Sequence, residues 1–439
     1  MRVMKFGGTS VGKPERMHQV SQLITRDAEP TIVVLSALSG TTNSLVEISN
    51  CLSAGDKAGA TLKIEALENH YQLFITDLIK APELLLKAQD VLKEHFEFLR
   101  ITQRVSLSDA LNKDILAQGE LMSTKLFSLY LEQEKIEHAL IPALEFMRLD
   151  INEEPDLLLI EEKIKVVLAN HPTKKLFITQ GYICRNSKGE VDNLKRGGSD
   201  YTASLIAAAV KATVCEIWTD IDGMHNNDPR VVDKTVAIEQ LSFDEAAELA
   251  YFGAKILHPT CIWPAQQENI PVKLLNTMQP TAAGTVIKKE AGSVGVKAVA
   301  AKDGIIAIKI KSSRMLLAYG FLRKIFEVFE KYKTPIDMIT TSEVAVSVTI
   351  DTDEHLNEII AELSNIASVE VEKNQTIVSI VGNEIAKTDA ILKKLFDAIN
   401  EVPVTMVSYG GSHHNISLLI PSTYKTKTLQ LVNKGLFNL

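Results

Sequence analysis

Short apolar segments alternate with helical patterns from the amino terminus to about residue 290, and this alternation restricts the possible folds more than any other feature. Five segments have the length and composition of strands: 2–6, 31–36, 176–181, 215–219 and 271–275. They are apolar on both faces, which is typical of a mainly parallel sheet covered by helices on each side. The sequence therefore predicts an α/β fold, with ligands bound beyond the carboxyl ends of its strands.

Helical patterns fill the intervals between these strands. A long helical stretch is expected over 58–131. Ser242 and Glu245 form a capping box ahead of an apolar helical segment, and Gly253 suits its carboxyl-terminal end. Ser199 and Asp200 are expected to cap an alanine-rich helix over 201–211.

The last third of the chain contains an internal repeat. A turn at 280–284 and a polar connector at 288–295 precede it. LRKIFEVF at residue 322 resembles LKKLFDAI at residue 392, and SEVAVSVTI at residue 342 aligns with SHHNISLLI at residue 412, so both pairs are offset by 70 residues. Each repeat is interpreted as strand, helix, strand, strand, which predicts two small α+β modules.

Composition limits the class of protein. The chain has 439 residues, with 46% apolar and 23% charged, which is enough for two or three globular domains. Its net charge of −8 argues against a nucleic-acid partner or an anionic membrane surface. The four cysteines form no CxxC pair, and Cys184 and Cys215 lie in apolar runs and are expected to be buried thiols. The sequence MRVMKFGG has no apolar signal region, and a cytoplasmic protein is expected.

The first strand ends in KFGGTS. Gly7 and Gly8 would let backbone N–H groups approach an anion, Thr9 and Ser10 can cap the following helix, and Lys5 adds a full positive charge. Together they favour phosphate binding, although the spacing fits neither a P-loop nor GxGxxG. The alternative is that Lys5 is an ordinary solvated lysine.

Two further segments supply opposite charges. In LKRGGSDY, Arg196 could bind a carboxylate or phosphate with two hydrogen bonds, and Asp200 beside it favours a ligand that carries both charges. In QGELMS, Glu120 could bind an amino group. An α-amino acid needs such a pair of charges. The alternatives are a basic hairpin end and a surface glutamate.

WTDIDGMHNNDPR and FGAKILHP complete the candidate motifs. The first follows a predicted parallel strand, so its polar residues could contact ribose, adenine or phosphate, although Asp-Pro-Arg is also common in loops. Lys255 in the second could be another phosphate-side cation or could complement a helix carboxyl terminus.

In this order KFGGTSVG, LSALSGTTN, QGELMS, LKRGGSDYTA, WTDIDGMHNNDPRV and FGAKILHP resemble the motifs of aspartokinases, and TTSEVAVSVTID resembles their first ACT module. The likeness is greatest to the monofunctional, lysine-sensitive branch. It implies a catalytic amino-acid kinase domain over 1–290, a three-layer αβα sandwich. It also implies a regulatory region over 291–439 with two ferredoxin-like ACT modules, at about 304–372 and 373–439, the latter completed by 293–303.

The resemblance also implies the reaction. ATP and L-aspartate would give ADP and 4-phospho-L-aspartate, the first step towards lysine, threonine and methionine, with Mg²⁺ bound through the nucleotide and no metal ligand assigned in the protein. Residues implied in catalysis are Lys5, Gly7, Gly8 and Asp200. Residues implied in aspartate binding are Ser36, Thr42, Glu120, Arg196 and Ser199. Residues implied in ATP binding are Lys5, Gly8, Thr219, Asp220, His225, Arg230 and Lys255.

By the same resemblance, lysine would bind as an effector between ACT modules of a homodimer or a dimer of dimers. The matching positions are Met315, Phe321, Leu322, Ile336, Asp337, Thr341 and Ser342. Asp337 would take the ε-ammonium, since a buried amine needs a carboxylate. The chain departs from the branch at His225, where relatives carry tyrosine, at 226–227, where they carry a threonine pair, and at Leu317, where they carry histidine.

Other functions compete with this interpretation. One is an amino-acid kinase for glutamate, N-acetylglutamate, carbamate or a nucleotide, which the pairing of Glu120 with Arg196 disfavours. Another is a catalytically silent amino-acid sensor, which the intact Lys5, Arg196 and Asp200 disfavour. A fusion with homoserine dehydrogenase is not expected, because no dinucleotide fingerprint follows the repeat.

Overall fold

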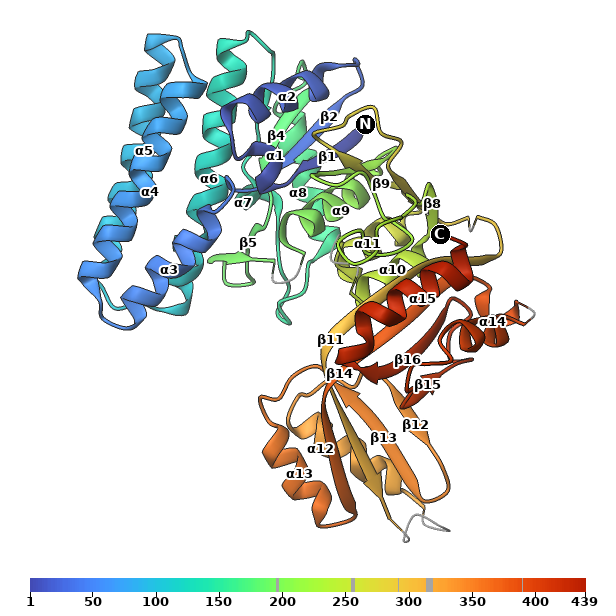
Figure 1. Ribbon diagram of the computed structural model, residues 1–439. Helices are drawn as coiled ribbons and strands as arrows, with labels where there is room; N and C mark the ends of the chain where they lie inside the picture. Colours follow the sequence, from blue (N-terminus) through green and yellow to red (C-terminus); the bar gives the residue numbers. More distant parts are fainter. Residues whose placement is uncertain (195–196, 254–256, 291, 313–318, 389) are drawn as a thin grey trace. The chain divides into compact units, whose positions relative to one another are not determined.

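The computed structural model describes residues 1–194, 197–253, 257–290, 292–312, 319–388 and 390–439 (Figure 1). Contacts divide the chain into two compact units. The first contains Met1–Met224 and Leu257–Lys289, and the second contains His225–Ile256 and Glu290–Leu439. The chain therefore leaves the first unit after Met224 and re-enters it at Leu257.

The first unit is built on one sheet, in which the strands are ordered β3-β4-β2-β1-β7-β9-β10. Neighbouring strands are parallel from β3 to β9, and β10 is antiparallel to β9. Their bounds are β1 Arg2–Phe6, β2 Thr31–Leu35, β3 Ala139–Leu140, β4 Leu176–Gln180, β7 Cys215–Thr219, β9 Val272–Asn276 and β10 Thr285–Lys288. The five predicted strands are confirmed within one residue at each end, because they are the continuous apolar segments at the centre of the sheet.

Helices cover both faces of this sheet. One group includes α2 to α6, which pack against one another, and α6 contacts β2 and β4. The other group includes α8, α9 and α11, with α9 against β1 and β7. The bounds are α1 Gly8–Val11, α2 Pro14–Thr25, α3 Thr41–Ser53, α4 Lys57–Leu78, α5 Pro82–Thr102, α6 Asp109–Gln133, α7 Ala143–Phe146, α8 Leu157–Ala169, α9 Gly198–Val210 and α11 Pro259–Gln267.

The alternation of side chains along β1 decides where its lysine points. Met4 and Phe6 belong to a buried cluster with residues of α2 to α6. Because successive side chains of a strand point to opposite faces, Lys5 lies on the other face, where α9 begins. The same alternation that builds the core therefore directs the Lys5 side chain towards α9.

The second unit contains α10 (Phe243–Tyr251), β8 (Gln240–Ser242) and a six-stranded antiparallel sheet with the order β12-β13-β11-β14-β16-β15. The strands of that sheet are β11 Gly295–Lys311, β12 Ile339–Thr341, β13 Ala345–Ile350, β14 Ser368–Asn383, β15 Met406–Ser408 and β16 Asn415–Pro421. Its helices are α12 Phe321–Lys331, α13 Leu356–Ser364, α14 Ile391–Ala398 and α15 Lys425–Phe437.

The internal repeat is confirmed in this sheet. The first residues of helices α12 and α14 are 70 residues apart, and so are the first residues of strands β13 and β16. Each repeat has its own buried cluster, one around α12 and α13 and the other around α14 and α15. The helices α13 and α15 extend the predicted strand, helix, strand, strand pattern. Two long strands, β11 and β14, run through both repeats, and the early part of β11 pairs with the late part of β14.

The predicted helical stretch over 58–131 is helical in three segments, because Pro82 begins α5 and Ser108 caps α6. One prediction about a helix cap is wrong. Helix α9 begins at Gly198, with Gly197 as its N-cap in the left-handed conformation (φ 76°), and neither Ser199 nor Asp200 caps it. The predicted capping box at Ser242 and Glu245 is present, and Gly253 follows α10 with a positive φ of 115°.

Two smaller observations complete the fold. Cys184 and Cys215 are fully buried, as expected. Among the described helices, none combines the length and the apolar character needed to cross a membrane.

Candidate functional site

A cavity of about 450 Å³ lies at the carboxyl ends of neighbouring strands in the first unit. Its walls come from the segments after β1, β2 and β4, from α6 and from the start of α9. The residues that line it are Gly8, Thr9, Ser36, Ala37, Leu38, Ser39, Gly40, Thr42, Asn43, Glu120, Tyr182, Gly198 and Ser199. Since β1, β2 and β4 are adjacent in the sheet, their following loops converge there, as expected for a parallel α/β sheet.

Lys5 and Asp200 form an ion pair beside this cavity. Lys5 Nζ lies 2.6 Å from Asp200 Oδ1, and their side chains are 11% and 18% exposed. Asp200 reaches Lys5 because it stands in the first turn of α9, on the face of the sheet to which β1 directs its lysine. The pair fixes an ammonium group at the end of β1 while leaving it partly open to solvent.

The glycines after Lys5 have different roles. A Cβ on Gly7 would lie 3.4 Å from Lys5 Nζ, so glycine leaves the ammonium group accessible. The Gly7 N–H donates to the Trp218 carbonyl oxygen at 3.3 Å, which differs from the expectation that it faces an anion. Gly8 opens helix α1, and N–H groups of a first helical turn have no intrahelical acceptor. Of the two amides, that of Gly7 is therefore bonded to Trp218, and that of Gly8 stands at the start of a helix.

Hydroxyl groups connect the opposite walls of the cavity. Ser36 Oγ donates to Ser199 Oγ at 2.9 Å, and Ser123 Oγ donates to the Ser36 carbonyl oxygen at 2.8 Å. Thr42 lines the same cavity from the start of α3. The predicted residue Ser199 is thus brought to Ser36 and Thr42, although it is far from both in the sequence.

Glu120 is the most unusual side chain of the cavity. It is 3% exposed, and its Oε2 atom has no hydrogen-bond partner among the described residues. Burial raises the pKa of the Glu120 carboxyl to about 8, although backbone hydrogen bonds at Ala37 and at Glu120 itself act in the opposite direction. A buried carboxylate with an unsatisfied oxygen is a ready binding site for an ammonium group.

Gly119 explains how Glu120 reaches this position. A Cβ on residue 119 would lie 2.8 Å from Ala37 Cβ and 3.2 Å from Thr41 Cγ2. Glycine therefore allows α6 to approach the loop after β2 closely enough for Glu120 to line the cavity. The glycine that weakens the helix locally is required by this contact.

Tyr182 lines the cavity but was not among the residues predicted from the sequence. It has a positive φ of 67°, which is uncommon for a bulky residue, and its N–H donates to Thr202 Oγ1 at 2.9 Å. Burial raises the pKa of Tyr182 to about 12, and the neighbouring charge of Glu120 acts in the same direction. The available sequence signal was its place directly after a central parallel strand.

The residues predicted to bind ATP are divided between the two units. In the first unit, Thr219 ends β7 and its Oγ1 donates to Asp220 Oδ1 at 3.1 Å. In the second unit, His225 Nδ1 is 2.8 Å from Thr235 Oγ1. There, both oxygens of Asp228 accept hydrogen bonds from the Arg230 guanidinium, at 2.9 and 2.8 Å. An incoming anion would have to compete with Asp228 for Arg230.

Three predicted site residues lie outside the described residues: Arg196, Lys255 and Met315. Of the predicted effector residues, Phe321 is buried at the start of α12, Leu322 and Thr341 are exposed, and Ile336 is half-buried. Ser342 is exposed at the end of β12, where its N–H donates to the Ala345 carbonyl oxygen.

Asp337 already has partners within the second unit. Its Oδ1 accepts from Lys302 Nζ at 2.8 Å and from the Tyr251 hydroxyl at 2.8 Å. Lys302 Nζ also lies 2.9 Å from Asp351 Oδ2. Asp337 Oδ2 is buried and has no hydrogen-bond partner among the described residues. One oxygen of this carboxylate is therefore satisfied and the other is not.

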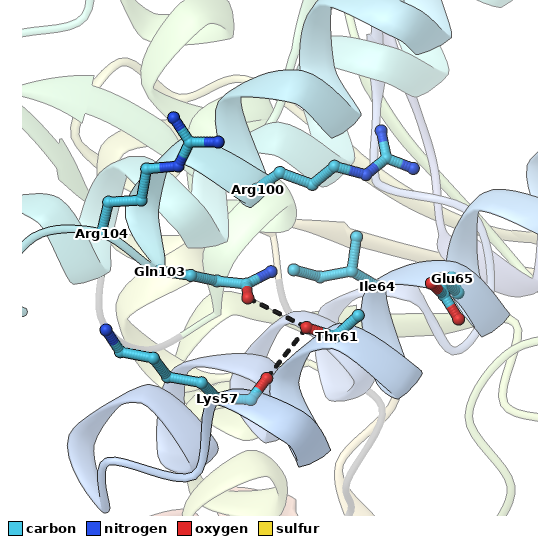
Figure 2. Close-up of a pocket in the computed structure, with 7 residues that line it drawn as sticks. All are labelled: Lys57, Thr61, Ile64, Glu65, Arg100, Gln103 and Arg104. Atoms are coloured by element: carbon cyan, nitrogen blue, oxygen red, sulfur yellow. Dashed lines mark hydrogen bonds between the residues drawn. The ribbon is translucent and has the colours of Figure 1, made fainter.

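A second cavity, of about 310 Å³, lies between α4 and α5 (Figure 2). Lys57, Arg100 and Arg104 line it, but their charged groups are well separated in Figure 2. Arg100 is paired with Glu68. Because these cations do not converge on one point, this cavity lacks the concentrated positive charge that a phosphate site needs.

The next question is whether the described residues include ligands for a metal ion. Among the residues that the structure describes, no group of three or more His, Cys, Asp or Glu side chains is arranged to hold a metal ion. The cavity instead offers the carboxyl group of Glu120, hydroxyl groups and the backbone of Gly8, and the Lys5–Asp200 pair lies beside it. This set suits a ligand with a phosphate or carboxylate at one end and an amino group at the other.

Comparisons with known proteins agree with this chemistry. The model of the amino acid kinase family matches residues 1–276, and an ACT domain model matches residues 378–436. The lysine-sensitive aspartokinase 3 of Escherichia coli is 34% identical, over 99% of both chains. The chloroplastic aspartokinase 3 of Arabidopsis thaliana is 35% identical, over 95% of this chain and 78% of that protein.

Solved structures give the same result. The crystal structure of E. coli aspartokinase III in complex with aspartate and ADP matches with a TM-score of 0.87 and 32% identity, over all of both chains. The structure of the same enzyme in complex with lysine and aspartate matches with a TM-score of 0.81, over 100% of this chain and 99% of that chain. The predicted amino-acid kinase fold with a carboxyl-terminal ACT region is confirmed. The chain belongs to the amino acid kinase family and, within it, to the aspartokinases.

Proposed function

We propose that this protein is an aspartate kinase that transfers the γ-phosphoryl group of ATP to the side-chain carboxylate of L-aspartate, giving 4-phospho-L-aspartate and ADP. The observation that carries this proposal is the unsatisfied carboxylate of Glu120, which faces the same cavity as Gly8 and Ser199, beside the Lys5–Asp200 pair. The relatives in E. coli and A. thaliana are named as aspartokinases, which supports the choice of substrate.

The proposed roles follow from charge. Glu120 binds the α-ammonium of aspartate, and Arg196 binds its α-carboxylate. Ser36, Thr42 and Ser199 donate to or accept from the remaining polar atoms of the substrate. This arrangement leaves the side-chain carboxylate of aspartate directed towards the end of β1, where Lys5 lies.

Catalysis in this arrangement requires no general base, because the attacking carboxylate is already ionised at neutral pH. The barrier comes from bringing two anionic groups together, so the protein contributes alignment and fixed positive charge. The Lys5 ammonium, held by Asp200, and the Gly8 amide would stabilise the migrating phosphoryl group; Gly7 contributes by leaving Lys5 uncovered.

The remaining contacts to ATP are proposed for Thr219, Asp220, His225, Arg230 and Lys255. Mg²⁺ is proposed to arrive with the nucleotide and to neutralise charge along its phosphates. The imidazole of His225 offers less stacking area than a phenol ring, so the contact with adenine is expected to be weaker than with tyrosine.

The regulatory proposal is feedback inhibition by lysine through the second unit. The buried Oδ2 atom of Asp337 lacks a partner and could accept the ε-ammonium of lysine, while Lys302 and Tyr251 keep Oδ1. The remaining proposed contacts are Met315, Phe321, Leu322, Ile336, Thr341 and Ser342. An E. coli relative is named as lysine-sensitive, which supports lysine rather than threonine as the effector.

We also propose which parts of the chain are catalytic and which are regulatory. Residues 1–290 would form the catalytic domain and residues 291–439 the regulatory region, with modules at about 304–372 and 373–439. The pairing of Gly295–Lys302 with Ile377–Asn383 supports completion of the later module by 293–303, as does Val299 in its buried cluster.

Strands β12 and β15 form the edges of the regulatory sheet, which suits assembly into a homodimer or a dimer of dimers. A cytoplasmic location is proposed because all four cysteines are unpaired.

The direct test is to trap the acyl phosphate with hydroxylamine in the presence of ATP and Mg²⁺. We expect a hydroxamate from L-aspartate and far less from L-glutamate, and inhibition by lysine but not by threonine. A greater yield from glutamate would identify a different amino-acid kinase. Absence of ATP turnover with either substrate would favour the alternative of a catalytically silent sensor.

A further inference from the structure

Three neighbouring strands of the first unit, β1, β7 and β9, end at the same edge of the sheet. They are adjacent and parallel, so their carboxyl ends lie beside one another. The segment after β1 carries Gly8, which lines the amino-acid cavity, and β7 ends at Thr219, which is proposed to contact ATP. The segment after β9 begins at Thr277 and takes no part in the proposed contacts with either substrate.

A buried pair of hydroxyl groups joins this segment to helix α1. Ser10 Oγ and Thr277 Oγ1 are 2.7 Å apart, although 267 positions separate the two residues in the sequence. Ser10 is 0% exposed and Thr277 is 1% exposed. Ser10 was expected to cap the following helix, but the N-caps of α1 and α2 are Gly7 and Lys13. The Ser10 hydroxyl is therefore used for a long-range contact.

Backbone hydrogen bonds complete a closed path through the ends of the three strands. The Thr277 N–H donates to the Thr219 carbonyl oxygen at 2.8 Å, and the Gly7 N–H donates to the Trp218 carbonyl oxygen at 3.3 Å. The Ser10 N–H donates to the Gly7 carbonyl oxygen at 2.9 Å. Together with the pair of hydroxyls, these contacts form a hydrogen-bonded ring of Gly7, Ser10, Thr277, Thr219 and Trp218.

The hydrogen-bonded ring includes residues next to both proposed ends of the ATP site. Lys5 and Gly8, which are proposed to contact the migrating phosphoryl group, flank Gly7 in the sequence. Thr219 belongs to the ring, and Asp220 follows it. A shift of the end of β7 relative to the end of β1 would break a contact of the ring. Such a break is costly at the pair of hydroxyls, because a buried hydroxyl would lose its partner.

We propose that Ser10 and Thr277 are positioning residues for ATP, which hold the end of β7 at a fixed distance from the end of β1. The γ-phosphate can then reach Lys5 while the rest of the nucleotide contacts Thr219. This inference rests on the proposed function. Among the described residues that line the amino-acid cavity, neither Ser10 nor Thr277 is included, so their effect is on ATP rather than on aspartate.

The primary test is Thr277→Val, which keeps the shape of the side chain and removes its hydroxyl. We expect kcat/KM for ATP to fall about 100-fold, as for a misplacement of roughly 1 Å, with the aspartate KM within about twofold of wild type. Ser10→Ala should have the same effect, and Thr277→Ser, which keeps the hydroxyl, should largely restore the wild-type value. Thr102→Val is the matched control, because it removes a buried hydroxyl that donates to the Leu99 carbonyl oxygen within α5, and it should leave both KM values unaltered.

The double variant Ser10→Ala/Thr277→Val separates positioning from stability. Each single variant leaves one buried hydroxyl without its partner, whereas the double variant removes both hydroxyls, so its Tm should recover towards that of wild type. Its kcat/KM for ATP should stay as low as in the single variants, because the link between the strand ends is still missing. Recovery of kcat/KM together with the Tm, or wild-type kcat/KM in Thr277→Val, would refute the proposal.

Nucleotide binding gives a measurement that does not depend on turnover. The affinities of wild type and Thr277→Val for ADP and for a non-hydrolysable ATP analogue can be compared by calorimetry. Thr277→Val should bind ADP within about twofold of wild type and should lose most of the additional affinity that the γ-phosphate provides. Equal weakening of both nucleotides would count against the proposal. A wild-type protein that neither turns over ATP nor binds either nucleotide would instead refute the proposed function.

Discussion

The substitution Glu120→Gln tests whether the cavity holds a carboxyl group that is destabilised by burial until an ammonium group binds. The Glu120 side chain is 3% exposed and one of its oxygens has no partner among the described residues. Glutamine has the same shape and can keep the hydrogen bond from the backbone at Ala37, but it cannot become charged. We therefore expect the variant to be more stable than the wild type wherever the wild-type carboxyl is ionised.

The sign and size of the expected change in unfolding free energy follow from the linkage between proton binding and folding. The pKa of Glu120 rises from 4.5 to about 8 on folding, so the native state binds the proton more tightly than the unfolded state does. The stabilisation that the wild type gains from this tighter proton binding is fully present below about pH 4.5 and decreases as the pH rises towards 8. The difference of 3.5 pKa units corresponds to about 5 kcal/mol in full, of which about 3 kcal/mol develops between about pH 5 and pH 8.

The assay is thermal unfolding of wild type and Glu120→Gln without ligands at about pH 5 and pH 8. We expect the Tm of the variant to gain about 6 °C relative to wild type on going to the higher pH, using the typical unfolding entropy per residue for the first unit. Aspartate should stabilise the wild type but scarcely stabilise the variant. A Tm difference that does not change with pH would show that Glu120 is not held in a desolvated state, and would refute the reasoning.

Four other predictions concern activity. As the pH rises from about 6 to 8, Glu120 loses its proton, so the aspartate KM should fall by about 50-fold while kcat changes little; a flat KM profile would contradict the assignment of Glu120. Lys5→Met should lower kcat by about 10²–10³ with retained folding, and near-normal turnover would exclude the proposed role of Lys5. Arg196→Ala should raise the aspartate KM far more than the ATP KM, and an unchanged aspartate KM would argue against the role of Arg196. Asp337→Asn should raise the lysine concentration needed for half-inhibition at least about tenfold without lowering the uninhibited rate, since a buried ammonium would lose its counter-charge; full lysine sensitivity would exclude Asp337 as its partner.

The sequence predicts the central sheet well because its signal is local. A strand buried on both faces is a continuous apolar segment, and β1 and β7 are located this way to the residue. The capping box at Ser242 is equally local, since donor and acceptor are three residues apart. The repeat of 70 residues is also visible without any structure, because each copy buries the same face of its helix and strands.

The start of α9 was predicted wrongly because side chains there have distant partners. Ser199 and Asp200 have the residue types of helix caps, but Ser199 bonds to Ser36 and Asp200 pairs with Lys5. Both contacts span more than 160 residues of sequence. The left-handed Gly197 performs the N-cap role instead. The tendency of serine and aspartate to cap helices is therefore outweighed here by the long-range contacts of Ser199 and Asp200 at the cavity.

The candidate site likewise contains residues that can be predicted from the sequence and residues that cannot. Polar residues at or directly after the carboxyl ends of strands, such as Lys5 and Ser36, can be selected from the sequence because their position places them at the ligand-binding edge of the sheet. The pairing of Ser10 with Thr277 cannot, because two hydroxyl residues 267 positions apart are ordinary residues until the fold brings their oxygens to 2.7 Å. The pKa of Glu120 likewise depends on burial, which the sequence alone does not reveal.

The most direct test of the account is a crystal structure with aspartate and a non-hydrolysable ATP analogue. We predict that the γ-phosphate lies within hydrogen-bond distance of Lys5 Nζ and the Gly8 N–H, with the side-chain carboxylate of aspartate in line with it and the substrate ammonium on Glu120. A γ-phosphate bound away from the end of β1, or an aspartate turned so that its ammonium avoids Glu120, would contradict it.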